Sequence, residues 1–216
     1  MTEMDPHRDQ PVAWVGPRPE ESGRVVIMIH GRNASPRNIL DLVPRLTRSD
    51  FSYVAPSAAN NTWYPLSFLS DLSRNEPFLS SALRRLDRLV IELSSAGIPP
   101  GRIVLLGFSQ GACLAAEFAA RHAQRFGGLI VFSGGLIGPP GTVWNNQGDF
   151  AGTPVFLGCS DTDAHVAKWR VDESADVLER MGADVIKRIY PGMGHVVSDE
   201  EIAEAQAVLD RVPARE

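Results

Sequence analysis

The stretch RIVLLGFSQGACLAAEFAARH, at residues 102–122, decides the fold. Its first part, IVLL, is a continuous aliphatic run, which is typical of a strand buried on both faces of a parallel sheet. Its second part, which begins at Gln110, predicts a helix running towards residue 125. Between the two lies GFSQG, in which Gly107, Ser109 and Gly111 have the spacing Gly-x-Ser-x-Gly. This is the strand, sharp turn and helix of a nucleophile elbow, in which a serine is presented at the turn.

Further strands and helices are predicted to alternate along the chain. The apolar runs are RVVIMIHG (24–31), GGLIVFSGG (127–135), TPVFLGCSD (153–161), ADVIKRIYPGMGH (183–195) and the weaker FSYVAPSA (51–58). The helices are predicted around residues 79–93, 168–181 and 198–212, the last with Ser198 and Glu201 in a capping box. We therefore expect one α/β domain at residues 21–216, with a mostly parallel central sheet and helices on both faces, preceded by a tail or edge segment at 1–20.

Bulk properties limit the function classes. The 216 residues carry a formal net charge of −5, and no basic cluster suggests binding to nucleic acid or to an anionic membrane. Residues 1–14 contain no apolar stretch typical of a leader, and no segment approaches the ~20 apolar residues of a membrane span. Cys113 and Cys159 do not suggest a secreted disulfide framework. We expect a cytoplasmic protein with no membrane anchor.

Three residue types needed for nucleophilic catalysis follow one another in the order serine, aspartate, histidine. Ser109 is the predicted nucleophile, and His195, just past the final strand, is the predicted base. The orienting acid is expected in CSDTDAH, where both Asp161 and Asp163 satisfy the order. Asp161 is favoured because it is closer to the strand end, and Asp163 remains the alternative.

Two backbone N–H groups are expected to form an oxyanion hole. One is that of Gln110, directly after the nucleophile, and the other is that of Arg32, in the turn HGRN after the first apolar run. The Arg32 side chain could also touch substrate. His30, which ends that run, is interpreted as structural.

Two long irregular segments, 56–77 and 134–152, could line a substrate pocket. The aromatic side chains expected in its walls are Trp63, Tyr64, Phe68 and Trp144. Packing over the edge of the sheet is an equally good interpretation of these four residues.

Taken together, HGRNAS, TWYP, GFSQG, SDTDAH and GMGH occur in an order that resembles the phospholipase and carboxylesterase family of α/β hydrolases, which includes acyl-protein thioesterases. The resemblance implies the α/β-hydrolase fold and a serine carboxylesterase acting on small esters or thioesters. It implies Ser109, Asp161 and His195 as the catalytic triad, with the oxyanion N–H groups at Arg32 and Gln110. Two departures are Asn33, where the family commonly has Gly, and Thr162, where many members have Pro.

Other functions are weighed against this hypothesis. The same residues could open a lactone, as dienelactone hydrolases do, although those typically use Cys in place of Ser109. The fold could also serve as a non-catalytic module that binds a small apolar ligand. A metal site formed by Asp161, Asp163, His165 and His195 is less favoured because the spacing matches no common metal motif. No cofactor or metal is expected, and an oligomer is possible.

Overall fold

The structure is a computed structural model that describes residues 4–214. Within these residues seven strands form one sheet, in the order β1-β3-β2-β4-β5-β6-β7. The strands are β1 (Val12–Val15), β2 (Val25–Ile29), β3 (Ser52–Pro56), β4 (Ile103–Phe108), β5 (Gly128–Phe132), β6 (Pro154–Ser160) and β7 (Asp184–Tyr190). All neighbours pair in parallel except β1 and β3, which are antiparallel. The predicted mostly parallel sheet is therefore confirmed.

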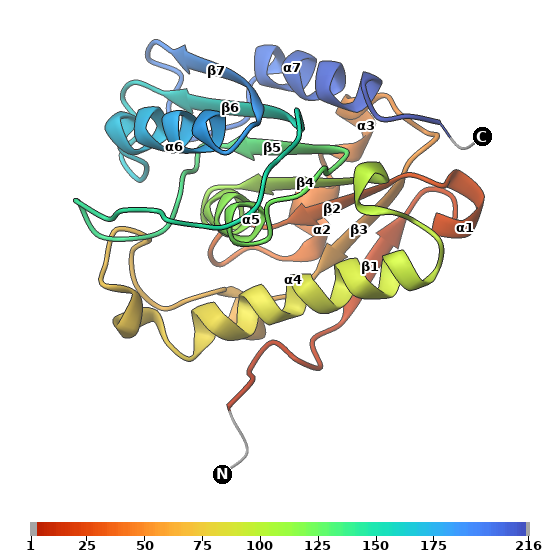
Figure 1. The fold of residues 1–216 in the computed structure, drawn as a ribbon, viewed down its shortest axis with the longest axis horizontal. Helices are drawn as coiled ribbons and strands as arrows, with labels where there is room; N and C mark the ends of the chain where they lie inside the picture. Colours follow the sequence, from red (N-terminus) through yellow and green to blue (C-terminus); the bar gives the residue numbers. More distant parts are fainter. Residues whose placement is uncertain (1–3, 215–216) are drawn as a thin grey trace.

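Helices cover both faces of this sheet (Figure 1). The α-helices are α1 (Pro19–Ser22), α2 (Pro36–Leu40), α3 (Val43–Leu46), α4 (Phe78–Ser95), α5 (Gln110–Arg121), α6 (Lys168–Arg180) and α7 (Asp199–Asp210). Short 3-10 helices lie at Ala59–Asn61, Leu72–Asn75 and Pro100–Arg102. Buried side chains of α4, α5 and α6 pack on one face, and those of α2, α3 and α7 pack on the other.

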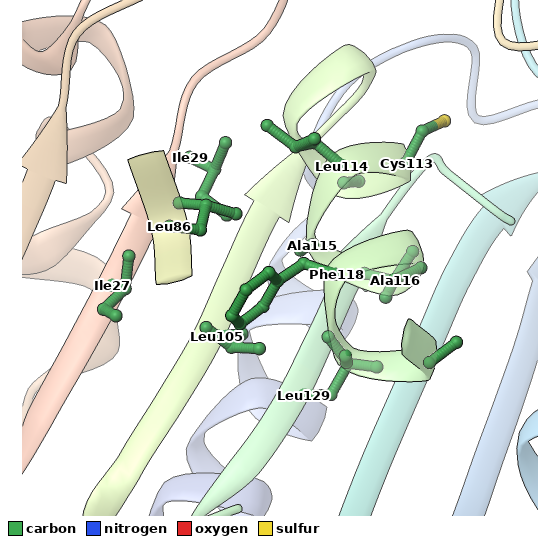
Figure 2. Packing of buried hydrophobic residues seen from close by; sticks show 14 of the residues in the cluster. Ile27, Ile29, Leu86, Leu105, Cys113, Leu114, Ala115, Ala116, Phe118 and Leu129 are labelled. Atoms are coloured by element: carbon green, nitrogen blue, oxygen red, sulfur yellow. The ribbon is translucent and has the colours of Figure 1, made fainter. Parts of the chain in front are cut away.

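Each central strand divides its side chains between the two faces. In β2, Ile27 and Ile29 belong to the cluster under α4 and α5, whereas Met28 belongs to the cluster under α7. Figure 2 shows the first cluster, with Phe118 of α5 over the sheet close to Leu105. This double burial explains the continuous apolar runs in the sequence.

The edges of the sheet differ from its centre. Strand β7 is at one edge, as its alternating sequence predicted, and most of its residues are exposed or half-buried. The other edge is β1, which lies in the segment 1–20 that was expected to be a tail or edge segment; no strand was predicted there because the segment VAWV is short. No helix among residues 4–214 is long and apolar enough to cross a membrane.

The direction of the strands brings four connections together. Because β2, β4, β6 and β7 run in parallel, the segments that follow their carboxyl ends emerge at one edge of the sheet. These segments contain residues 30–34, Ser109, 161–166 and 191–197. The sequence motifs that carry chemistry thus meet at this edge.

Candidate active site

Ser109 stands in a strained turn between β4 and α5. Its φ of 57° and ψ of −121° lie outside the regions that L-residues commonly adopt. The glycines on either side allow this turn to form: a Cβ on Gly111 would lie 2.1 Å from the carbonyl oxygen of Ile29, and one on Gly107 would lie 2.3 Å from the carbonyl oxygen of Gly111. The crowding explains why the motif has glycine at both positions.

Ser109 and His195 are hydrogen-bonded to each other. The distance from Ser109 Oγ to His195 Nε2 is 2.9 Å. The other ring nitrogen of His195, Nδ1, lies 2.7 Å from Oδ2 of Asp163. With a proton on Nδ1 donated to the carboxylate, Nε2 can accept the serine proton. The structure therefore brings together a hydroxyl, an imidazole and a carboxylate in the order that a nucleophile, a base and an acid require.

The aspartate that is hydrogen-bonded to His195 is Asp163 and not Asp161, which corrects the expectation from the sequence. Asp161 uses its Oδ1 to accept the backbone N–H of Gly192 at 2.8 Å. That contact connects the end of β6 to the turn that precedes His195, so Asp161 stabilises the loop that carries the histidine. Proximity to the strand end favoured Asp161, but the turn at 161–162 points its carboxylate at backbone and leaves the next aspartate facing the imidazole.

Local hydrogen bonds hold Asp163 in its orientation. Its Oδ1 accepts the backbone N–H groups of His165 and Val166 at 2.8 Å and 3.0 Å, which leaves Oδ2 for His195. Burial of the Asp163 carboxyl raises its pKa, but the hydrogen bonds from His195 and from the two backbone groups outweigh burial, and the net pKa is lowered. The carboxylate is therefore ionised when the imidazole needs a partner.

The residues of the two predicted oxyanion donors, Arg32 and Gln110, both line a hollow beside Ser109. Within residues 4–214 no acceptor is bonded to the backbone N–H of Arg32 or of Gln110. Asn33, which replaces the family's usual glycine, adopts a φ of 58° and donates its N–H to Asn61 at 2.8 Å. Asn tolerates this left-handed conformation, so the turn needed after β2 still forms.

The side chains of Arg32 and Gln110 hold the neighbouring loop at residues 63–66 in place. Gln110 accepts the N–H of Trp63 at 2.9 Å and donates to the carbonyl oxygen of Tyr64 at 2.8 Å. Arg32 donates to the carbonyl oxygens of Pro65 and Leu66 at 2.8 Å and 2.6 Å. Residues 63–66 are thus attached to both residues whose backbone N–H groups were predicted to form the oxyanion hole.

A hollow of about 540 Å³ opens beside Ser109 and His195. Tyr64 and Phe68 line it, as the sequence suggested, but Trp63 and Trp144 do not. Trp63 is fully buried and donates its indole N–H to the carbonyl oxygen of His30 at 2.8 Å, so it holds the loop from inside.

Trp144 lies away from the hollow. The guanidinium of Arg170 lies over its ring, 4.9 Å from the ring centre, and the indole packs against the core. The segment 134–152 follows β5 and is anchored on α6, because Arg170 also donates to the carbonyl oxygen of Leu136 at 2.9 Å. The alternative interpretation, packing beside the sheet, is the correct one for Trp144.

A second hollow of about 470 Å³ adjoins the first at His195. Its walls include Ile39, Leu42 and Val197, with Arg45 among them. The two hollows share His195 and the turn after β2. The two hollows thus meet at the imidazole.

His7 contributes to the site from the N-terminal segment, which sequence reasoning missed. It is fully buried, and its Nδ1 accepts the N–H of Ala59 while its Nε2 lies 2.9 Å from the carbonyl oxygen of Trp63. Burial lowers the pKa of His7 and so favours the neutral ring that this pattern requires. No motif surrounds His7, so only the tertiary structure reveals its contact with the loop beside the oxyanion hole.

The candidate metal ligands make other contacts. Asp161 is bonded to Gly192, and both oxygens of Asp163 are engaged by His195 and by backbone N–H groups. Within residues 4–214 no group of three His, Cys, Asp or Glu side chains is arranged to hold a metal ion.

The sequence and the fold of this chain match those of known proteins. The family model described as phospholipase/carboxylesterase matches residues 15–212. The chain belongs to this family. A crystal structure of a phospholipase/carboxylesterase from Dyadobacter fermentans is 38% identical, with a TM-score of 0.91 over 96% of this chain and 99% of that one. The α/β-hydrolase fold expected from the motifs is confirmed.

Curated relatives in the family are more distant. Acyl-protein thioesterase 1 of Gibberella zeae is 34% identical over 56% of this chain and 52% of its own length. Acyl-protein thioesterase 1 of Eremothecium gossypii is 28% identical over 77% of this chain and 75% of its own length. The chain thus spans about half to three quarters of these two relatives. The family to which the chain belongs is described by the activities phospholipase and carboxylesterase.

Proposed function

We propose that this family member hydrolyses carboxylic ester or thioester bonds through an acyl-enzyme on Ser109. The observation that carries the proposal is the unbroken hydrogen-bonded series from Ser109 Oγ through His195 to Asp163, set in the wall of a hollow. In this proposal Asp163 takes the role that the sequence assigned to Asp161.

The first step forms the acyl-enzyme. Ser109 Oγ attacks the carbonyl carbon while His195 Nε2 takes the hydroxyl proton, and Asp163 stabilises the resulting imidazolium. The backbone N–H groups of Arg32 and Gln110 bind the oxygen on which negative charge develops. The attack gives a tetrahedral intermediate. When it collapses, the bond to the alcohol or thiol breaks, and the alcohol or thiol leaves with the proton from His195.

The second step releases the acid. Water takes the place of the leaving group, gives its proton to His195 Nε2 and attacks the acyl carbon. Ser109 then leaves with that proton, and the free carboxylic acid departs. The two hollows that meet at His195 provide room for the acyl part and for the leaving group. A series of p-nitrophenyl esters of increasing acyl length measures how much chain the site accommodates.

The decisive experiment is Ser109→Ala. We expect kcat for p-nitrophenyl butyrate to fall by at least about 10⁴-fold, because the remaining groups cannot form an acyl-enzyme. Ser95→Ala, at the exposed end of α4, is the matched control and should keep full activity. A fluorophosphonate should label the wild-type chain at Ser109 and should not label Ser109→Ala. Equal turnover by both Ser109→Ala and the wild type would contradict the proposal.

The rival functions differ in the same assays. A module that only binds ligand would show neither turnover nor labelling, and the positioned His195 and Asp163 argue against it because binding alone needs no base. A lactone hydrolase would prefer a cyclic ester over its open-chain counterpart. We further propose that the enzyme acts in the cytoplasm, a reducing compartment that suits the two buried thiols, Cys113 and Cys159.

A further inference from the structure

The hollow beside Ser109 has an unbalanced charge. One of its lining side chains, Arg32, carries a permanent positive charge, two others are histidines, His165 and His195, and no Asp or Glu is among the lining residues described. The carboxylate behind the wall, Asp163, is already engaged through both oxygens. No carboxylate of the described lining residues therefore neutralises this positive charge, and a bound molecule could supply the negative charge.

Arg32 is the permanent charge of this group. Within residues 4–214 no carboxylate forms an ion pair with its guanidinium, and the two hydrogen bonds it makes go to the uncharged carbonyl oxygens of Pro65 and Leu66. A guanidinium has five N–H donors, so three are still available. The carbonyl bonds and the Tyr64 ring, whose centre is 5.9 Å from Cζ, hold the group in place at the wall. Such a prearranged guanidinium is suited to binding a carboxylate.

The second hollow shows the contrast. It also has an arginine, Arg45, but that guanidinium forms an ion pair with Asp199 at 2.8 Å and donates to the carbonyl oxygen of Val197. Its remaining lining residues are mostly apolar. The positive charge of the second hollow is thus compensated within the protein, whereas that of the first is not.

We propose that Arg32 makes the enzyme selective for esters or thioesters that carry a carboxylate in the part of the substrate occupying the first hollow. This inference rests on the proposed function, because it names the class of substrate for that site. Arg32 then serves twice: its backbone N–H faces the developing oxyanion, and its guanidinium binds the distant carboxylate. Because one residue reaches both groups, the ester and the carboxylate are separated by only a few methylene groups. Half-esters of short dicarboxylic acids have this form.

The test compares kcat/KM for two esters of the same acyl length, mono-p-nitrophenyl adipate and p-nitrophenyl hexanoate. A second pair moves the charge to the leaving group, with p-carboxyphenyl butyrate against its methyl ester. In the wild type we expect the charged member of one pair to be preferred. Arg32→Gln should lower that preference by about tenfold or more, since a charge-assisted hydrogen bond is lost. High salt should also lower the preference in the wild type.

Three further variants test whether the preference for the charged ester depends specifically on Arg32. Arg32→Lys should keep part of the preference, because it keeps the charge and loses the planar fork. Arg102→Gln, at the amino end of β4 and therefore at the opposite edge of the sheet, should leave both activity and preference unchanged. Arg45→Gln should change the preference less than about twofold, because its charge is already paired.

The outcomes separate the two proposals. An unchanged preference in Arg32→Gln, a preference lost in Arg45→Gln, or no preference in the wild type would overturn the role of Arg32. If Arg32→Gln is inactive on every ester, Arg32→Lys decides, and equal rates on the charged and neutral esters in that variant would overturn the role as well. If the wild type hydrolyses no ester, or Ser109→Ala remains active, the proposed function fails and the inference fails with it.

Discussion

The turn at Ser109 and the loop at 161–166 both supply groups to the same hydrogen-bonded series, but they are built in different ways. The turn is fixed by contact of backbone with backbone, since neither Gly107 nor Gly111 has room for a Cβ. The loop is fixed by side-chain hydrogen bonds, in which Asp161 and Asp163 accept the N–H groups of different backbone segments. Crowding leaves a signature in the sequence, namely glycine, whereas the choice between two aspartates does not.

The difference between the two aspartates is tested by replacing each of them in turn with asparagine. Asp163→Asn should lower kcat by about 10⁴-fold, because an amide that donates to His195 Nδ1 stabilises the wrong tautomer. Asp161→Asn should lower kcat less than about tenfold, because the amide oxygen can still accept the N–H of Gly192. The measurement is kcat for p-nitrophenyl butyrate in both variants.

Equal losses in the two variants would mean that the loop acts as one unit. A larger loss in Asp161→Asn would return the role of the acid to the residue that the strand end favoured. Circular dichroism of each variant separates a change in chemistry from a loss of folding.

The turn at Ser109 is tested by adding one methyl group. Gly111→Ala should lower the free energy of unfolding by about 4 kcal/mol or more, because the new Cβ would meet the backbone oxygen of Ile29 at 2.1 Å and backbone cannot move aside cheaply. Gly101→Ala is the matched control, since its nearest neighbour would be 3.9 Å away, and it should change stability by less than about 1 kcal/mol. Urea unfolding measures both. A Gly111→Ala variant as stable as Gly101→Ala would show that crowding does not determine the turn.

The same contrast explains how much of the molecule the sequence could predict. Periodic apolar runs predicted the six parallel strands and the four longer helices, because burial on one or both faces imposes a regular pattern. Strand β1 has no such pattern, because it depends on pairing with β3 at the edge. Ser109 and His195 could be placed because each follows a strand end and the parallel sheet collects those ends.

Positions within loops could not be predicted in this way. Trp63 and Trp144 have the same side chain and lie in similar loops, yet one is tied to His30 under the site and the other packs against Arg170 on α6. His7 is bonded to residues more than fifty positions away in the chain. Such contacts are decided by which polar atoms remain unpaired once the core has formed, and local sequence does not record them.

The acid side of the site contains a second carboxyl group, Glu201 of α7, whose pKa is shifted in the opposite direction to that of Asp163. Its side chain is fully buried, its Oε2 accepts the N–H of Ser198 at 3.0 Å, and Oε1 has no partner within residues 4–214. Burial raises the pKa of Glu201 to about 7. Asp163, with its several donors, has its pKa lowered instead.

The raised pKa of Glu201 makes stability depend on pH. Between the ordinary value of 4.5 and about 7 the folded chain binds more protons than the unfolded chain at this residue, so its stability falls as the pH rises through that range. Glu201→Gln keeps an oxygen for the Ser198 N–H and cannot ionise. We expect the variant to gain about 2 kcal/mol relative to the wild type between pH 4.5 and 7, measured as free energy of unfolding in urea. Glu204→Gln, in the same helix and partly exposed, is the control and should show no such gain. If the free energy of unfolding depended on pH in the same way in Glu201→Gln and in the wild type, the Glu201 carboxyl would ionise in the folded chain as it does in water. The hydrogen bonds around Asp163 would then not explain a difference in pKa between the two acids.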